Sequence, residues 1–254
     1  MVNCRFQVQR ALHRSAFRRD GAAPQYLGKE MGNLHIDRPQ VVYAAHFAGP
    51  SICHHTMPIK PHIHADAIAQ LFTEAHTQNG WLPDPVPETT LRELHRLTSL
   101  APTSMNCQPM RLVFLTTAAA KERLIATLSP GNVDKTRQAP VTAIVATDTQ
   151  FYEHMPQIWQ GAGARDMFAG NPPLATITAT RNGTLGGAYL ILAARAVGLD
   201  CGPMSGFDNA KVDAEFFADG RFKSNFICSL GVGDPAKVRP RNARLSFEQA
   251  CEVL

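Results

Sequence analysis

The sequence predicts an α+β protein in which helices cover a central sheet. Strand and helix patterns follow one another without the strict alternation of a βαβ protein. Hydrophobic residues make up 44% of the 254 residues and charged residues 18%, which favours a buried globular core over a disordered chain. No apolar run reaches the ~18 residues of a transmembrane helix, so we expect a protein that does not enter a membrane.

The regular patterns begin at Asp66, which we expect to cap a helix with an apolar face. Thr90 and Glu93 have the spacing of a capping box, and they precede a leucine-striped helix that ends before Pro102. Short apolar runs between breakers predict buried strands. These strands are expected at Arg111–Thr117, Val141–Thr147 and Asn225–Gly231, with a short helix at Lys121–Leu128.

A long helix is expected from about Thr176 to Val197, with Gly198 as its C-terminal cap. Three glycines interrupt its middle, and each costs about 1 kcal/mol in a helix interior. They are Gly183, Gly186 and Gly187. Small residues at these positions permit close approach of another backbone or of a flat ligand.

The last segment combines a basic run with a helix start. Arg239, Arg241 and Arg244 follow a Gly–Asp–Pro turn, and guanidinium groups at such spacing can clamp a phosphate. A solvated basic face is the alternative interpretation. Ser246 and Gln249 then have the spacing of a capping box, which predicts a C-terminal helix.

The excess positive charge lies near the N-terminus. Residues 1–60 hold eight Lys and Arg against three Asp and Glu, whereas residues 61–254 hold 17 against 18. The near-neutral body therefore offers no basic surface for a nucleic acid. We interpret residues 1–57 as an extension that is disordered or translated from upstream of a native start at Met57, and residues 58–254 as one domain. A basic transit-like leader is the alternative for the extension.

The six cysteines are widely spaced, and none belongs to a C-x-x-C pair or follows a signal-peptide core. We therefore expect reduced thiols in a cytoplasmic protein. One cluster of metal-ligand residue types lacks the spacings of structural zinc sites. Its members are Cys53, His54, His55, His62 and His64. We predict no metal there and interpret the stretch as disordered or tag-like, with a metal site as the alternative.

Two polar loops have unusual local chemistry, although the common catalytic motifs G-x-S-x-G, H-E-x-x-H and G-x-x-x-x-G-K-S/T do not occur. Residues 102–109 (PTSMNCQP) offer hydroxyls and amides that suit the edge of a planar heterocycle. Residues 201–207 (CGPMSGF) follow the glycine-rich helix, and Gly206 would allow a ligand to approach the backbone. Ordinary turns are the alternative for both loops.

Together these segments resemble the flavin-dependent nitroreductase family, and within it the malonic semialdehyde reductase branch of bacterial uracil breakdown. The resemblance spans Ala67 to Leu254. Its motifs are specific in combination, order and spacing. They are HTQNGW (76–81), PTSMNCQP (102–109), SPGNVDKT (129–136), FYEHMP (151–156), the stretch 181–208, KSNF (223–226) and GDPAKVRPRNARLSFEQA (233–250).

The resemblance implies a nitroreductase-like fold, with a mixed, mostly antiparallel sheet sandwiched by helices, in an interlocked homodimer that binds FMN at the subunit interface. By position, the residues near the phosphate and ribityl chain are His76, Thr77, Asn79, Arg241 and Arg244. Those reaching the flavin from the neighbouring subunit are Pro102, Thr103, Ser104 and Asn106. Those beside the ring are Asn132, Lys135, Pro203, Met204, Ser205 and Gly206.

One residue departs from the branch, which usually has Arg at the position of His76. An unperturbed histidine is mostly neutral at pH 7, so we expect weaker phosphate binding there. Gly206 and Lys135 are the catalytic candidates. Gly206 lies by flavin N5 in the family, and a cation at Lys135 would stabilise the anionic reduced ring near N1 and O2.

The reaction that the resemblance implies is reduction of an aldehyde, 3-oxopropanoate, to 3-hydroxypropanoate, with NADPH or NADH as hydride donor to FMN. A broad nitroarene or quinone reductase is one alternative, and a non-enzymatic flavin-binding or metal-binding protein is another. The residues leave the anchor of the substrate carboxylate open among Arg111, Arg181 and Lys223.

Overall fold

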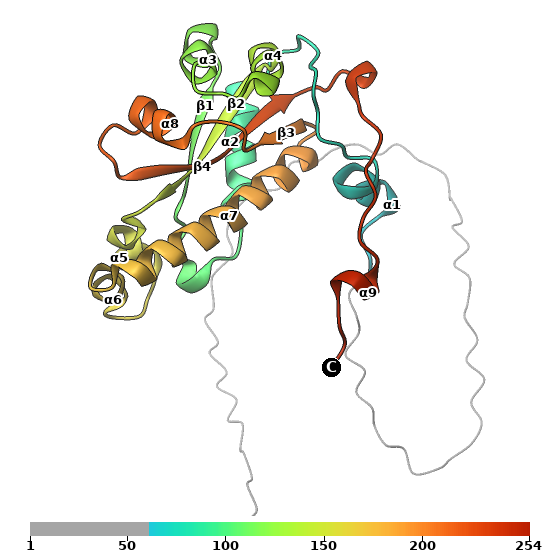
Figure 1. The fold of residues 1–254 in the computed structure, drawn as a ribbon. Coiled ribbons are helices and arrows are strands. Elements are labelled where there is room, and N and C mark those ends of the chain that lie inside the picture. The colour runs from blue at the N-terminus through green and yellow to red at the C-terminus, as the bar shows by residue number, and fades with distance from the viewer. Residues whose placement is uncertain (1–60) are drawn as a thin grey trace, which may run out of the picture. The chain divides into compact units, whose positions relative to one another are not determined.

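In the computed structural model, residues 61–254 are described, and they fold around one antiparallel sheet (Figure 1). Its strand order is β1-β2-β4-β3, with β1 at Met110–Leu115, β2 at Val141–Asp148, β3 at Asp200–Met204 and β4 at Phe222–Gly231. The expected α+β architecture is confirmed. The expected mixed pairing is limited to one parallel bridge, between Thr77 and Cys201, because all neighbouring strand pairs are antiparallel. The expected extension, with Cys53, His54 and His55, lies outside the described residues.

The central strand β2 is buried along its whole length because helices cover both faces of the sheet. Val141 and Val145 belong to the core on one face, whereas Ile144 and Ala146 belong to the core on the other. This division follows the two-residue period of a strand. A shift in register between Val145 and Ala146 interrupts the pairing with β4.

The first face is covered by α2 (Glu88–Thr98) and α7 (Pro172–Ala196). Leu91 and Leu94 of α2 are buried with Leu190 of α7, which confirms part of the expected leucine stripe. The expected capping box is wrong, because Pro87 occupies the N-cap position and makes no side-chain capping bond. The helix starts earlier than the pattern indicated, so Thr90 lies inside it.

The second face is covered by α3 (Ala118–Ile125), α4 (Pro130–Gln138) and α8 (Asn209–Phe216). Leu124 of α3 and Val212 of α8 are fully buried against Ile144 and Ile227. Neither α4 nor α8 is indicated by the sequence pattern. A further cluster lies near the N-terminal end of α7, where α5 (Met155–Ile158) and α6 (Ala164–Ala169) pack.

The glycines of α7 bring this helix close to side chains of the sheet. A Cβ at Gly183 would lie 2.5 Å from Thr147 Oγ1, and one at Gly186 would lie 3.0 Å from Met110 Sδ. At Gly187 it would overlap the ring of Phe226. We expected these glycines to admit another backbone or a flat ligand. This expectation is wrong, because side chains of the sheet occupy the space beside them.

Both ends of the described chain form short helices that bury none of their residues. These are α1 (Ala65–Ile68), continued by the π-helix η1 (Ala69–Thr73), and α9 (Phe247–Ala250). His64, and not Asp66, caps α1, whereas the capping box of Ser246 and Gln249 is confirmed. The C-terminal segment leaves the sheet and ends beyond α9 (Figure 1). No helix within residues 61–254 is long and apolar enough to cross a membrane.

Candidate functional site

A polar pocket of about 250 Å³ lies between the segment after η1, the end of α7 and the C-terminal segment. It contains a concentration of cationic groups, and the described residues that line it include no Asp or Glu. The principal side chains are His76, Thr77, Asn79, Arg195, Arg239, Arg241 and Arg244. This donor set fits a multiply charged oxyanion such as a phosphate, because guanidinium groups bind it through paired hydrogen bonds.

The arginines of this pocket have different roles. Arg241 donates from Nη2 to the carbonyls of Thr73 and Ala75, at 3.0 and 2.7 Å, and thereby ties the C-terminal segment to η1. Arg195 donates from Nη1 to the carbonyl of Leu71 at 2.7 Å. Arg244 bonds only to carbonyls of its immediate neighbours within the described chain. Its guanidinium is exposed and keeps donors for an anion.

The pocket is joined to the edge strand β3 through the segment that carries His76 and Thr77. Thr77 forms a parallel bridge with Cys201, and the amide of Gln78 donates to the carbonyl of Cys201 at 2.9 Å. β3 ends at Met204, and Ser205 follows it directly. Thr77 therefore lies beside the first residues of β3, whereas Ser205 and Gly206 follow its last residue and do not line the pocket.

A second contact fixes the loop after β3 against α4. Asn132 donates from Nδ2 to the carbonyl of Gly206 at 2.8 Å, and the amide of Ser129 donates to the same oxygen at 2.9 Å. A Cβ at Gly206 would lie 2.7 Å from Asn132 Nδ2. A larger residue at this position would have to displace the Asn132 amide and break its hydrogen bond to the Gly206 carbonyl.

Two further residues of this region have specific environments. Met204 is buried, and its Sδ accepts a weak hydrogen bond from Thr136 Oγ1 at 3.6 Å. Its side chain therefore belongs to the core on the second face of the sheet. Lys135 lies on α4, and burial lowers its pKa, with the charge of Arg239 lowering it further. The influence of Arg239 places Lys135 within electrostatic reach of the cationic pocket.

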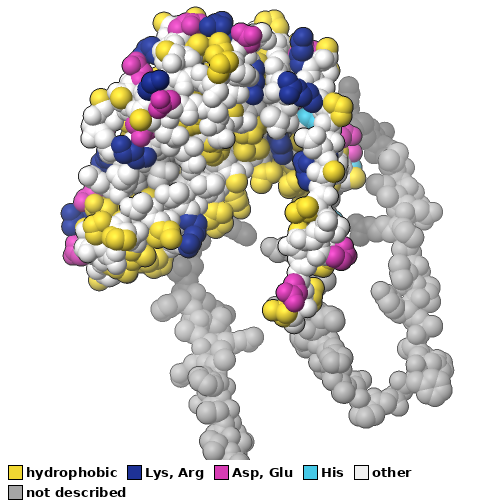
Figure 2. Space-filling model, in the orientation of Figure 1, with side chains coloured by type: hydrophobic (Ala, Val, Ile, Leu, Met, Phe, Trp, Pro, Cys, Tyr) yellow, Lys and Arg dark blue, Asp and Glu magenta, His cyan; other side chains and the backbone are white. Residues whose placement is uncertain are grey.

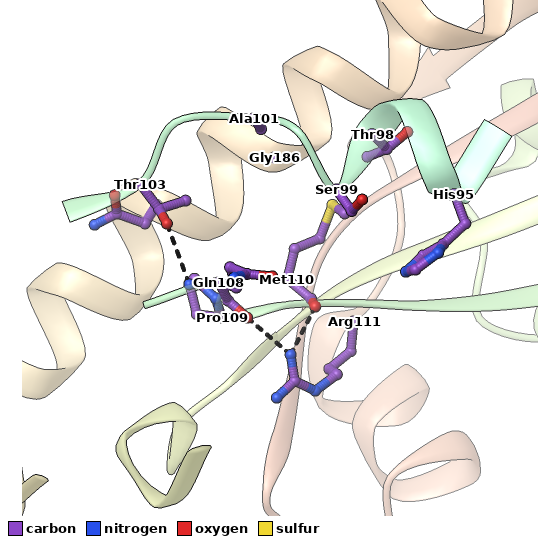
Figure 3. A pocket seen from close by; sticks show the side chains of 11 residues that line it. His95, Thr98, Ser99, Ala101, Thr103, Gln108, Pro109, Met110, Arg111 and Gly186 are labelled. Atoms are coloured by element: carbon purple, nitrogen blue, oxygen red, sulfur yellow. Dashed lines mark hydrogen bonds between the residues drawn. The ribbon is translucent and has the colours of Figure 1, made fainter. Parts of the chain in front are cut away.

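The loop of residues 102–109 lines a separate cavity of about 120 Å³ beside α7 (Figure 3). The amide of Ser104 donates to Asn182 Oδ1 at 2.8 Å, and Asn106 donates from Nδ2 to the carbonyl of Ile158 at 2.9 Å. Pro102, Thr103, Ser104 and Asn106 thus do not meet the cationic pocket within one chain. Their contribution from a neighbouring subunit stays a prediction.

Sequence reasoning missed Arg195 as a site residue and included Arg239 only as part of the basic run. Arg195 lies in the last turn of α7, more than a hundred residues from His76. Helical periodicity places it on a helix but does not show which distant segment that helix end meets.

Most of the described chain is similar to known proteins. Residues 76–234 match the model of the Nitroreductase family. A protein of Rhodopseudomonas palustris, provisionally named NADH dehydrogenase/NAD(P)H nitroreductase, is 54% identical over 185 residues, which cover 73% of this chain and 94% of the relative.

Solved structures show the same fold at low sequence identity. The crystal structure of the nitroreductase ydfN from Bacillus subtilis has a TM-score of 0.68 at 22% identity and covers 75% of this chain and 100% of its own. A nitroreductase of Exiguobacterium sibiricum, solved in complex with FMN, has a TM-score of 0.64 at 16% identity, with coverage of 76% and 99%.

Proposed function

The chain belongs to the nitroreductase family of NAD(P)H oxidoreductases, and from this premise we propose that it is an FMN enzyme that reduces malonic semialdehyde to 3-hydroxypropanoate. The observation that supports FMN best is the cationic pocket beside β3, which has no Asp or Glu among its described lining residues. When bound, FMN supplies the ring that takes hydride from NADPH or NADH and passes it to the substrate. We place the cofactor's phosphate at Arg244 and Arg239, with His76 beside them.

The other residues have proposed roles that follow from their positions. Asn132 and Gly206 shape the edge on which the ring would rest, because their contact fixes the loop after β3. Lys135 supplies a positive charge near this edge, and Arg241 holds the pocket wall in place through η1. Hydride transfer itself requires no acid or base side chain. This agrees with the absence of the common catalytic motifs from the sequence.

The substrate proposal rests on the resemblance to the malonic semialdehyde branch. Arg111 is an unfavourable carboxylate anchor, because its guanidinium already bonds to Asp148 at 2.7 Å and to two carbonyls. Lys223 lies 3.5 Å from Asp213 and half its side chain is exposed, so it stays a candidate, as does exposed Arg181. Reduction of nitroarenes or quinones is the second candidate function, favoured by the name of the Rhodopseudomonas relative.

A homodimer is proposed because large apolar side chains are exposed on α7 and on the C-terminal segment. Figure 2 shows hydrophobic side chains in two places: along the lower side of the molecule, below α7 in this view, and on the C-terminal segment. The exposed residues include Leu174, Ile177, Leu185, Tyr189, Leu245, Phe247 and Leu254. Covering these residues with a second copy would remove apolar area from water, which stabilises association. We also propose a cytoplasmic location, from the reduced thiols.

The deciding experiment compares 3-oxopropanoate with a nitroarene as substrate of the purified, FMN-loaded protein, with NADPH and NADH as alternative donors. A higher kcat/KM for 3-oxopropanoate supports the aldehyde reductase, whereas a preference for the nitroarene supports the broad reductase. A protein that binds FMN without oxidising either donor would be a non-enzymatic flavin protein. Light scattering of the same sample tests the dimer, which a monomer with full flavin occupancy would contradict.

A further inference from the structure

We propose that Asp148 and Arg111 form a positioning pair that holds the loop of residues 102–109 in its flavin-contacting shape. The pair is separate from the cationic pocket, and Asp148 belongs to no motif that the sequence analysis assigned to a function. This inference rests on the proposed function in one respect: it takes the loop to contact FMN. The hold of the pair on the loop itself can be measured without the cofactor.

The loop adopts a backbone that needs support. Met105, Asn106 and Gln108 have φ angles of 50°, 52° and 39°. Non-glycine residues adopt such left-handed angles rarely, and three of them within four residues persist only where surrounding contacts determine the conformation. Backbone strain of this kind gathers at ligand-binding segments, so its position in the polar loop is informative.

Arg111 supplies support from below the loop, as the dashed lines in Figure 3 show. Its Nη1 donates to the carbonyls of Gln108 and Met110, both at 2.9 Å. Its Nη2 donates to Asp148 Oδ2 at 2.7 Å, which fixes the direction of the guanidinium plane. The amide of Asp148 also donates to the carbonyl of Pro109 at 2.8 Å. Asp148 thus reaches the end of the loop through its backbone and through Arg111.

Asp148 is a rigid anchor because its side chain is fully buried and its acceptors are well occupied. Oδ1 accepts from Arg221 Nε and from the amide of Gln150, each at 2.9 Å, while Oδ2 accepts from Arg221 Nη2 at 2.9 Å. Burial by itself would raise the pKa of Asp148, but these hydrogen bonds and the charges of the two arginines hold it below its usual value. Asp148 therefore stays a carboxylate at neutral pH.

The two arginines on Asp148 differ in a way that supplies a matched control. Arg111 contacts both the carboxylate and the loop, whereas the side chain of Arg221 contacts the carboxylate and His154, at 3.3 Å from its Nη2, and not the loop. Both side chains are roughly equally exposed, at 26% and 31%. A purely structural role of the cluster would make the two arginines equivalent, whereas a positioning role distinguishes them.

Cys107 reports on the loop directly. Its side chain is 1% exposed, and burial raises the pKa of its thiol to about 11, so the native loop should protect it from alkylation. The experiment compares Arg111→Gln and Arg221→Gln in the full chain. It measures iodoacetamide labelling of Cys107 by peptide mass spectrometry, with and without FMN, and the FMN dissociation constant by fluorescence.

We expect Arg111→Gln to raise the labelling rate and the FMN dissociation constant roughly 10-fold or more, the effect typical of losing hydrogen bonds from a charged group. Arg221→Gln should lower stability to denaturant with little change in either quantity. Equal effects of the two substitutions, or unchanged labelling in Arg111→Gln, would overturn the proposal. Arg111→Lys, which keeps the charge but not the paired donors, replaces Arg111→Gln if that variant does not fold.

The outcome also separates this proposal from the proposed function. Wild-type protein that fails to bind FMN would contradict the cofactor assignment, while the labelling comparison would still test the hold on the loop. Labelling that rises in Arg111→Gln without any change in FMN affinity would overturn the flavin contact of the loop and leave the proposed enzyme intact.

Discussion

Asn132 donates from its side-chain amide to the carbonyl of Gly206, 2.8 Å away, and this bond joins α4 to the loop after β3. A Cβ at Gly206 would lie 2.7 Å from the same amide nitrogen, which is closer than real Cβ atoms come. We expect Gly206→Ala to displace the Asn132 amide, to destabilise the protein by about 1 kcal/mol through the lost hydrogen bond and to weaken FMN binding. Chemical denaturation and flavin titration measure both effects.

The control for this substitution is Gly131→Ala on α4. A Cβ at Gly131 meets no atom within 4 Å, and alanine is a better helix former than glycine. Gly131→Ala should therefore keep FMN affinity and gain up to about 1 kcal/mol of stability. Equal FMN affinity in the Gly206 and Gly131 variants would remove the loop after β3 from the flavin site.

Arg244→Ala tests the phosphate position. Losing a charge-assisted contact costs about 1.5–3 kcal/mol, which corresponds to roughly 10- to 150-fold in affinity. The FMN dissociation constant should rise by this factor, while the rate in FMN-saturated enzyme changes less. Arg92→Ala serves as the control, because Arg92 is an exposed arginine that pairs with Glu88 on α2. An unaltered dissociation constant in Arg244→Ala would place the phosphate elsewhere.

His76→Arg should shift FMN affinity in the opposite direction. Arginine keeps a permanent charge and offers paired donors that bind phosphate better than an imidazole does. The added charge would lie in a pocket that contains four arginines, so repulsion between cations should limit the gain in the absence of the phosphate. We therefore expect tighter FMN binding and slightly lower stability of the flavin-free protein. Flavin titration measures the expected gain in affinity. Melting of the flavin-free wild type and of the flavin-free His76→Arg variant measures the expected loss of stability.

The fold was predictable where the pattern was local. α7 and the strands β1, β2 and β4 followed from apolar runs, with boundaries that moved by a few residues. β3 overlaps the loop expected at 201–207, and Gly202 and Pro203, which are poor strand formers, hide the strand pattern there. It is the edge strand and pairs with β4 alone among the named strands, so a missing donor at Pro203 is tolerated there.

The basic run of the candidate site was predictable from its arginines alone, whereas the other site residues were predictable only through the family motifs. The resemblance named His76, Thr77 and Arg244, which the structure gathers in one pocket. It gave no indication of Arg195, whose position depends on the packing of a helix end against a distant segment. The left-handed backbone at Met105 was also unexpected, because non-glycine residues there give no sequence signature of a positive φ.

Asp148→Asn should make the free energy of unfolding less dependent on pH in the acidic range. The pKa of Asp148 is lowered in the folded protein, so its ionisation stabilises the fold above the unfolded pKa of about 3.9. This contribution is lost as the pH falls through the folded value. We expect the substitution to cost about 3 kcal/mol near neutral pH and progressively less below about pH 4. Urea denaturation of both proteins across this pH range gives the difference between their free energies of unfolding. A difference that does not change with pH would contradict a lowered pKa of Asp148 in the folded protein.

Removal of residues 1–56, so that the chain begins at Met57, should leave melting temperature and flavin content unchanged. The three hydrophobic clusters of the described chain all lie between Leu91 and Leu230, and the cationic pocket begins at Ala75. A longer deletion that continues to Thr73 removes α1 and η1. It thereby removes the η1 carbonyls of Thr73 and Leu71, which accept hydrogen bonds from Arg241 and Arg195. This longer deletion should reduce flavin content. Loss of flavin already in the shorter deletion would refute the single-domain boundary.

Lys135→Met tests the electrostatic role of α4 in the site. Reduced FMN carries negative charge at N1 and O2, and a nearby ammonium would stabilise this state more than the neutral oxidised ring. A unit pair at ~4 Å contributes about 4 kcal/mol at an effective dielectric of ~20. Partial exposure of Lys135 reduces this to about a third. Because 30 mV corresponds to about 1.4 kcal/mol for two electrons, the two-electron potential of bound FMN should fall by about 30 mV.

Lys121→Met separates this effect from a loss of folding. Burial lowers the pKa of Lys121 as it does that of Lys135, but its Nζ donates to the carbonyls of Arg137 and Ala139, at 3.0 and 2.6 Å. Lys121→Met should therefore lower stability without moving the potential or the rate of flavin reduction by NADPH. Lys135→Met should lower the potential and slow that reduction at nearly unchanged stability. A wild-type potential in Lys135→Met would remove Lys135 from the site, and Arg239, which lies close enough to lower its pKa, would then be the next cation to substitute.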